Sequence, residues 1–223
     1  MSHYAFSFKG ETLHALPSGA LFWPAQNLLC VSDLHFGKAQ RYALQGGGAL
    51  PPYEVHDTLM RLDHDITTQA ATTVVCLGDS FDRLGASVDL GPAARDWIIR
   101  LQAGRKWIWI EGNHDPGPVD LGGTHLAEYS CDNLVFRHIA LGEAAQSGEI
   151  SGHYHPKLTL NLKGRSLTRK CFAIDQGRLI MPAFGTYTGG LSVRSEPLTT
   201  LLSTHAIAVL TGDSALPVPI NAR

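Results

Sequence analysis

The sequence contains little cysteine and no long apolar run, and each scarcity argues against a class of protein. Four cysteines occur among 223 residues, far apart at positions 30, 76, 131 and 171. This spacing favours small buried thiols in a reducing compartment over disulfides or a zinc cage. No segment approaches the ~18 uninterrupted apolar residues of a membrane helix, and no secretory signal pattern opens the chain. We therefore expect a cytoplasmic protein with no membrane partner.

The net charge is also small, at −2, and does not by itself indicate a nucleic-acid-binding protein. Acidic residues are nevertheless absent from residues 34–53 and 155–174. Positive charge therefore gathers in two segments, although a solvated face with no partner explains either cluster alone equally well. The basic residues concerned are Lys38, Arg41, Lys157, Lys163, Arg165, Arg169 and Lys170.

Internal repeats and low-complexity tracts are absent, which favours a single domain over residues 1–223. The chain is 44% hydrophobic and long enough for one sizeable core, but short for two. After Thr211 the chain contains Pro217 and Pro219. We expect residues 211–223 to form a loosely ordered tail.

The pattern of apolar residues predicts an α/β (α+β) fold. Apolar residues recur at spacings of four, three and four from Val55 to Ile66, which indicates a helix, and a second helix is predicted over residues 92–102. Strands and helices alternate in the middle of the chain, which is typical of βαβ units with parallel strands. The predicted strands are 4–8, 13–16, 20–23, 28–32, 74–77, 107–110, 134–138, 157–162, 171–174, 179–181 and 207–210.

Four short polar motifs occur in one order along the chain; three follow apolar, β-rich runs and the fourth follows the shorter Glu149-Ile150-Ser151, so all four are expected at strand ends. Strand ends gather at one edge of a sheet, where open α/β folds bind ligands. Aspartate, asparagine and histidine are ligands suited to manganese, iron or zinc. The motifs are Asp33-Leu34-His35, Gly78-Asp79, Gly112-Asn113-His114-Asp115 and Gly152-His153-Tyr154-His155.

Each motif is weak when taken alone. Gly-Asp is a common turn, Gly-Asn-His-Asp fits a hairpin or an Asx-turn, and His-x-His on a strand often binds no metal. Four such motifs after four strands rarely arise by accident. Their joint occurrence therefore predicts a hydrolytic site with two metals.

The series resembles the calcineurin-like metallophosphoesterases, whose pattern is Asp-x-His, Gly-Asp-x-x-Asp, Gly-Asn-His-(Asp/Glu), a lone histidine and Gly-His-x-His. The second element is here Gly78-Asp79-Ser80-Phe81-Asp82, and the similarity spans about residues 28–160. The resemblance implies two mixed β-sheets packed face to face and flanked by helices. It also implies a metal-dependent phosphoesterase.

A narrower resemblance covers almost the whole chain and is to the ligase-associated DNA damage response endonucleases, the PdeM group. It implies a phosphodiesterase or endonuclease acting on DNA in bacterial repair, with a DNA ligase, a helicase and an exonuclease-like protein as partners. The sequence alone assigns no role to residues 182–191. The segments that carry the resemblance are residues 33–39, 50–51, 152–156, 169–172 and 182–191.

The family's metal ligands carry over onto matching positions in this sequence. The resemblance assigns four residues to each of two divalent metal ions, with Asp79 shared as the bridge. Manganese is our first choice, with iron and zinc as alternatives. The first set is Asp33, His35, Asp79 and His155, and the second set is Asp79, Asn113, His138 and His153.

The choice of the lone histidine leaves one alternative open. His138 is favoured because it ends the predicted strand 134–138, as the family pattern demands, whereas His125 follows two glycines in a predicted loop. His114 is expected to stabilise the transition state and to protonate the departing oxygen. Asp82 and Asp115 are expected to orient the ligands or His114.

Three functions compete at this point. A DNA phosphodiesterase or endonuclease is favoured by the narrower resemblance and by the basic segments, which are candidate nucleic-acid contacts. A phosphomonoesterase or a small-molecule phosphodiesterase is permitted equally well by the same metal site. A metal-free interaction module is disfavoured because the chain keeps the full ligand set. The sequence does not indicate strand preference or oligomeric state.

Overall fold

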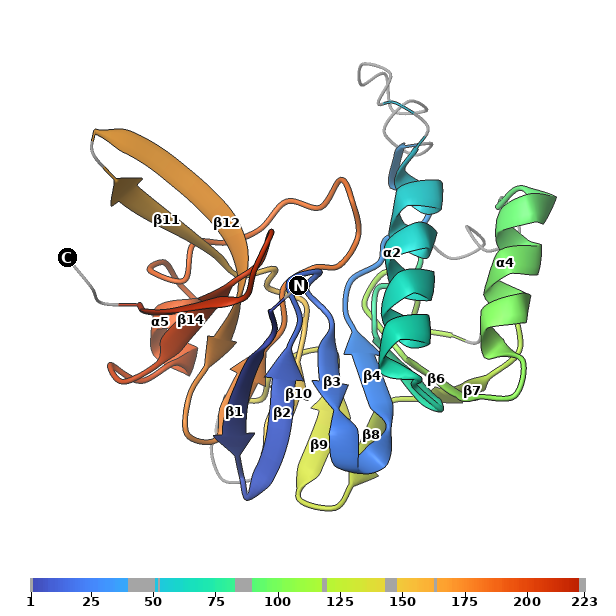
Figure 1. Cartoon of the computed structure of the whole chain (residues 1–223), viewed down its shortest axis with the longest axis horizontal. Helices are drawn as coiled ribbons and strands as arrows, with labels where there is room; N and C mark the ends of the chain where they lie inside the picture. Colours follow the sequence, from blue (N-terminus) through green and yellow to red (C-terminus); the bar gives the residue numbers. More distant parts are fainter. Residues whose placement is uncertain are drawn as a thin grey trace.

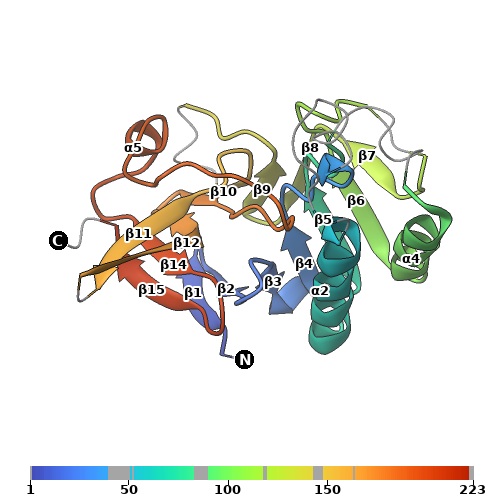
Figure 2. The same ribbon diagram turned by 90° about the horizontal axis from the view of Figure 1, so that it is seen from above.

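Two β-sheets pack face to face, with helices on the outside (Figures 1 and 2). The computed structural model describes residues 2–39, 51, 53–82, 90–117, 120–142, 148–162 and 164–220. The predicted fold class, two mixed sheets flanked by helices, is confirmed. Within the described ranges, no helix combines the length and apolar character needed to cross a membrane.

The first sheet holds the parallel core that the sequence predicted. Its strands follow chain order; β1 to β4 pair antiparallel, and β4 to β7 pair parallel. Helix α2 (Glu54–Gln69) connects β4 to β5, and α4 (Pro92–Gln102) connects β5 to β6. The strands are β1 (Tyr4–Phe8), β2 (Glu11–Ala15), β3 (Leu21–Trp23), β4 (Leu28–Val31), β5 (Thr73–Leu77), β6 (Lys106–Ile110) and β7 (Thr124–Leu126); a 3-10 turn, η1 (Pro24–Gln26), follows β3.

The second sheet has the order β15-β14-β12-β13-β10-β9-β8, with β11 paired to β12 outside this path. Strands β9, β10 and β13 are parallel neighbours, while the other pairs are antiparallel. The short helix α5 (Leu198–Leu201) lies on its outer side. The strands are β8 (Glu128–Cys131), β9 (Leu134–Arg137), β10 (Glu149–Ser151), β11 (Lys157–Leu162), β12 (Arg165–Ile174), β13 (Arg178–Ile180), β14 (Ile207–Leu210) and β15 (Leu216–Pro219).

Alternating residues of β5 show how the layers form. Val75 and Leu77 face the second sheet, whereas Val74 and Cys76 face the helices, because successive side chains of a strand point to opposite faces. The apolar stripe of α2 packs on the helix side, as its spacing predicted. All four cysteines are free, as expected, and Cys76 is among the three that are buried.

Some boundaries differ from those predicted. Strands β7 and β8 and helix α5 were not predicted, and β12 begins at Arg165 rather than at 171 because its first half pairs with β11. The expectation of a loosely ordered tail over residues 211–223 is wrong for the segment Leu216–Pro219, while residues 221–223 lie outside the described residues. Residues Leu216–Pro219 form β15 and pair with β14 at the edge of the second sheet.

Candidate metal centre

The four motifs meet where β4, β5 and β6 of one sheet and β10 of the other end. Five candidate ligands have a left-handed backbone, which is unfavourable for a residue with a side chain and persists only where the surroundings fix it. Backbone hydrogen bonds between the loops supply that constraint: Asp33 donates to the Gly78 carbonyl and His35 to the Asp79 carbonyl. The left-handed ligands are Asp33, His35, Asp79, His153 and His155.

Two motif glycines let these loops approach one another. Gly78 has φ +76°, and a Cβ there would lie 2.4 Å from the ring of His138. A Cβ at Gly152 would lie 1.9 Å from the hydroxyl oxygen of Ser32. Neither position can carry a side chain without moving a neighbouring strand end.

The carboxylate of Asp33 is oriented by hydrogen bonds to one of its oxygens. Oδ2 accepts from the Ser32 hydroxyl at 2.5 Å and from the His153 backbone N–H at 3.0 Å. Oδ1 is left facing Nε2 of His155 at 3.0 Å. Burial opposes ionisation, but the hydrogen bond and charge of His155 outweigh it and hold the pKa of Asp33 below its usual value. The group is therefore a carboxylate at neutral pH.

The carboxylate of Asp79 is held in the same way and faces both halves of the centre. Its Oδ1 accepts the backbone N–H of His114 at 2.9 Å. Its Oδ2 lies 3.4 Å from Nε2 of His138 and 3.9 Å from Nε2 of His35. Burial opposes ionisation, yet the His138 interactions lower the pKa of Asp79 to about 2. Oδ2 of Asp79 therefore faces His35 of the first predicted ligand set and His138 of the second.

Two histidines are fixed so that Nε2 points into the centre. Nδ1 of His138 lies 3.0 Å from the Leu77 carbonyl, which can only accept, so this nitrogen carries the proton. Nδ1 of His35 lies 3.3 Å from Oδ1 of Asp82. A hydrogen bond such as that of His138 fixes the tautomer of a histidine that binds a metal, whereas Nδ1 of His35 faces Asp82 at ion-pair distance without a hydrogen bond.

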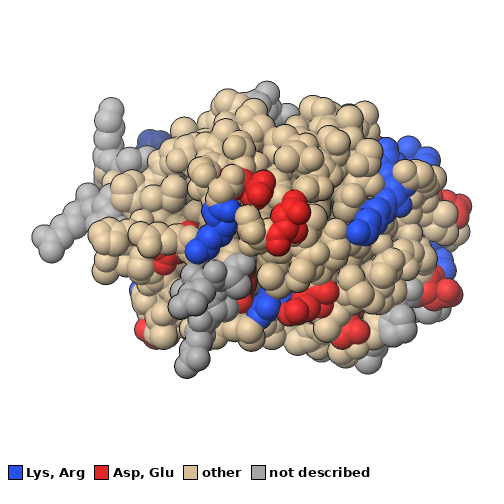
Figure 3. All heavy atoms as spheres, turned by 90° about the horizontal axis from the view of Figure 1, so that it is seen from below, with Lys and Arg blue, Asp and Glu red and all other residues tan. Residues whose placement is uncertain are grey.

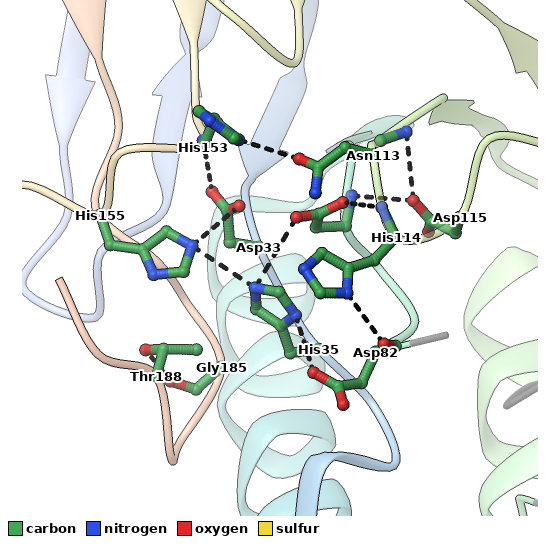
Figure 4. Close-up of polar contacts among 12 residues, drawn as sticks. Asp33, His35, Asp82, Asn113, His114, Asp115, His153, His155, Gly185 and Thr188 are labelled. Atoms are coloured by element: carbon green, nitrogen blue, oxygen red, sulfur yellow. Dashed lines mark hydrogen bonds and ion pairs between the residues drawn. The ribbon is translucent and has the colours of Figure 1, made fainter. Parts of the chain in front are cut away.

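The side-chain oxygen of Asn113 completes the second group. It lies 2.9 Å from Nδ1 of His153, as Figure 4 shows, and 3.1 Å from Nε2 of His138. Two sets of ligand atoms result, and the atoms of each set lie within 4.8 Å of one another. The chemistry of the donors and the inward-facing atoms fit a pair of divalent cations. The sets are Asp33, His35 and His155, and Asp79, His138 and His153.

Asp115 joins the loops after β5 and β6. Its buried carboxylate accepts four backbone N–H groups at 2.8 to 3.1 Å. Burial, with the nearby charge of Asp79, raises the pKa of Asp115 to about 6. The four donors belong to Asp79, Ser80, Phe81 and Gly112.

His114 lies beside the two sets of ligand atoms (Figure 4). Its Nδ1 is 3.0 Å from the backbone carbonyl oxygen of Asp82, so this nitrogen donates and Nε2 remains for other contacts. The ring meets that of His35 edge to face, with centroids 5.3 Å apart. Asp82 thus contacts His35 through its carboxylate and His114 through its backbone.

Comparison with known proteins agrees with this geometry. The family model described as calcineurin-like phosphoesterase matches residues 27–179, a span that includes all four motifs. The chain belongs to the calcineurin-like phosphoesterase family. It is therefore a metal-dependent hydrolase.

Solved structures extend the comparison of this phosphoesterase. The crystal structure of Pseudomonas putida nuclease MPE has a TM-score of 0.75 and 28% sequence identity, and the match covers 97% of this chain and 100% of that one. This match supports the narrower resemblance to the PdeM group. A conserved uncharacterized protein of Streptococcus pneumoniae, titled a predicted phosphoesterase, has a TM-score of 0.34 and 12% identity over 86% of this chain and 95% of its own, and adds nothing to the assignment. No curated protein sequence matched the chain.

Residues 182–191, to which the sequence alone assigned no role, form a wall of the phosphoesterase centre. Phe184 and Gly185 donate backbone N–H groups to the carbonyls of Ser32 and Asp33 at 2.8 and 3.1 Å. Nζ of Lys170 lies 2.7 to 2.9 Å from three oxygen atoms of this segment. Those oxygens belong to Ala183, Gly185 and Thr188.

Helix α2 holds the other side of this segment. Arg61 donates to the Phe184 carbonyl at 2.9 Å and to the Thr186 hydroxyl at 3.1 Å, and Thr186 donates to Asp57 at 2.6 Å. Sequence reasoning missed these residues because their partners lie more than a hundred positions away. The sequence signal for this segment was limited to Ser32, whose carbonyl binds Phe184 and which directly precedes the candidate ligand Asp33.

The remaining candidates lie apart from the ligands. His125 lies on β7 with its ring stacked against Trp109 and belongs to neither ligand set. Among the proposed nucleic-acid contacts, Lys170 is engaged inside the protein, and Arg41 and Lys163 lie outside the described residues.

The other four proposed nucleic-acid contacts differ in their exposure to solvent. Arg165 and Arg169 are exposed on the β11–β12 hairpin, which extends from the body in Figure 1, whereas Lys38 and Lys157 are half-buried. Figure 3 shows the face opposite the strand ends that carry the motifs, where acidic and basic side chains are interspersed. Exposed cations of the hairpin are therefore the better candidates for contact with an anionic polymer.

Proposed function

We propose that this phosphoesterase is a two-metal phosphodiesterase that cleaves DNA as an endonuclease. The observation that carries the proposal is the position of Asp79, whose Oδ2 faces histidines of both ligand sets. Asp79 would be shared by the two ions, three further residues would hold each ion, and His138 would be the lone histidine of the family pattern. The further ligands are Asp33, His35 and His155 for one ion and Asn113, His138 and His153 for the other.

Two divalent cations at this site would supply an activated water nucleophile and neutralise charge on the phosphoryl oxygens. The protein's own contribution to leaving-group departure is assigned to His114. With Nδ1 bound to the Asp82 carbonyl, Nε2 of the protonated ring is placed to donate a proton to the departing oxygen. Asp82 also orients His35, so one residue positions both a ligand and the acid.

DNA is favoured over a small substrate by two observations. The similar Pseudomonas putida protein is titled a nuclease, and the match covers both chains almost completely. Exposed Arg165 and Arg169 extend beyond the centre on a hairpin. Manganese as the metal, a cytoplasmic location and a repair role beside a DNA ligase, a helicase and an exonuclease-like protein complete the proposal.

A panel of substrates tests it. Manganese-loaded protein is offered labelled single- and double-stranded DNA, including circular DNA, next to a simple phosphodiester and a phosphomonoester. We expect internal cuts in DNA and hydrolysis of the diester. Efficient hydrolysis of the monoester without DNA cleavage would replace the proposal with a phosphomonoesterase.

The hairpin arginines give this test a matched variant. Arg165→Gln/Arg169→Gln should flatten the dependence of DNA binding on log salt by about 0.7 per lost contact on single strands. Cleavage of the simple diester should stay at the parent rate, because the ligands are untouched. Lys106→Gln, at the opposite end of β6 from the third motif, is the control. An unchanged salt slope would exclude the hairpin from DNA binding.

A further inference from the structure

A hollow of about 370 Å³ opens beside the second ligand set. Asn113 and His138 form part of its wall, so it is continuous with the metal centre. Its volume lies at the lower end of the ~300–1,000 Å³ typical of small-molecule sites. The other lining residues are Glu111, Gly112, Pro116, Ala127, Glu128, Arg137, Ile139 and Leu141.

One side of the hollow is apolar and exposed. Ile139 is 42% exposed and Leu141 52% exposed, and Pro116 also lines the hollow. Single exposed apolar residues are ordinary on protein surfaces. Two of them beside candidate metal ligands instead offer an apolar surface to a substrate group bound there.

A buried ion pair holds the backbone of Leu141 in place. Glu149 is fully buried and Arg178 almost fully buried, and Nε of Arg178 lies 2.8 Å from Oε1 of Glu149. Oε2 of Glu149 accepts the Leu141 N–H at 3.0 Å, and Arg178 donates to the Leu141 carbonyl. Anchoring of this kind keeps the exposed side chain in place without burying it.

The charges of the hollow disfavour a second phosphate. Arg137 is the sole cation among the described lining residues, and it lies 3.0 Å from Glu128 and 3.7 Å from Glu149. Glu111 is exposed on the wall and can accept N–H groups. An uncharged planar group with N–H donors therefore suits this hollow better than a phosphate.

We propose that the hollow is a nucleobase subsite, which takes the base of a nucleotide whose phosphate lies at the two metals. The inference rests on the proposed phosphodiesterase function and adds the place where a base of the substrate binds. Ile139 and Leu141 contact the base face, since apolar side chains hold bases in such pockets. Glu111 accepts from an N–H on the edge of the base.

Three diesters with one common leaving group test the subsite. Thymidine 5′-(p-nitrophenyl phosphate) and its 3′ isomer carry a base, whereas methyl p-nitrophenyl phosphate does not. The parent should show a lower KM for at least one thymidine ester than for the methyl ester. In Ile139→Ser/Leu141→Ser that KM should rise roughly 5- to 150-fold, the range for loss of one stacked base, with the methyl ester within about twofold of parent.

Ile99→Ser is the control, because Ile99 is similarly exposed, at 51%, but lies on α4 outside the hollow. It should leave all three esters unchanged. An equal KM for the thymidine and methyl esters in the parent, or an equal loss on both in the double variant, would overturn the subsite.

Calorimetry on manganese-loaded protein measures the subsite without turnover. Thymidine 5′-monophosphate should bind the parent more tightly than inorganic phosphate does, and the double variant should lose this difference while keeping its phosphate affinity. Equal affinity of both probes for the parent would overturn the inference. Absence of diester and DNA cleavage, with the nucleotide preference retained, would instead overturn the proposed function alone.

Discussion

At the scale of single residues, hydrogen bonds decide which atom of each candidate ligand faces the centre. Asp33 and Asp79 each have one oxygen held by a backbone N–H, and the other oxygen faces histidine nitrogens. His138 is fixed by the Leu77 carbonyl in the same manner. The four motifs could be predicted from sequence because their residue types and spacing are short-range features. These orienting contacts could not, because they join distant strands.

The role of His114 is a property of one side chain. His114→Ala should keep both metals and lose roughly 10²–10⁴-fold in turnover on DNA, because the departing alkoxide needs a proton. The loss should be much smaller on a p-nitrophenyl ester, whose leaving group departs without one. Turnover numbers measured with both substrates, beside metal analysis, check this. Equal losses on both would contradict the assignment of a general acid.

At the scale of elements, the sequence was informative wherever apolar periodicity was strong. Helix α4 has the predicted bounds, and the apolar stripe of α2 packs against the first sheet. Strands β7 and β8 were missed because they are short, polar and partly exposed. Strand β15 contains two prolines, which suggested a loose tail, but an edge strand tolerates the missing N–H groups.

The wall formed by residues 182–191 depends on one lysine from β12. Lys170→Met should lower the free energy of unfolding by about 1–3 kcal/mol at pH 7, because it removes a hydrogen-bond donor from three buried oxygens, of which the Gly185 carbonyl keeps the Thr188 hydroxyl as a second donor. It should also slow turnover, since this segment binds the backbone of Asp33. Denaturant melts and steady-state rates measure the two effects. Lys106→Met is the exposed control; it loses only a surface contact with Tyr129, so it should lower stability by less than about 1 kcal/mol and leave turnover unchanged.

The stability lost in Lys170→Met should also depend on pH. Burial, reinforced by the charges of Arg61 and Lys157, lowers the pKa of Lys170 from 10.5 to about 7 in the folded protein. Between these values the unfolded chain binds more protons, so the Lys170 contribution to stability rises with pH. The stability difference between parent and Lys170→Met should therefore widen from pH 7 to pH 9. A constant difference would show that the folded lysine titrates normally.

At the scale of the whole molecule, the two sheets bring together candidate ligands that lie as far apart in sequence as Asp33 and His155. Parallel strands β4, β5 and β6 end at the same edge, and β9 and β10 of the second sheet supply the remaining histidines there. The family pattern predicted this convergence from the order of the motifs. It could not predict the hollow beside His138, because Leu141 is held there by a buried ion pair from residues 149 and 178.

Metal content of an Asp79 variant tests the account most directly, because Asp79 is the one residue assigned to both ions. The parent and the exposed-site control Asp96→Asn should each retain two manganese ions per chain after gel filtration, measured by elemental analysis. Asp79→Asn should keep its fold by circular dichroism but retain fewer than two ions and lose DNA cleavage. Two ions retained in an Asp79→Asn protein with parental activity would contradict the bridged two-metal centre.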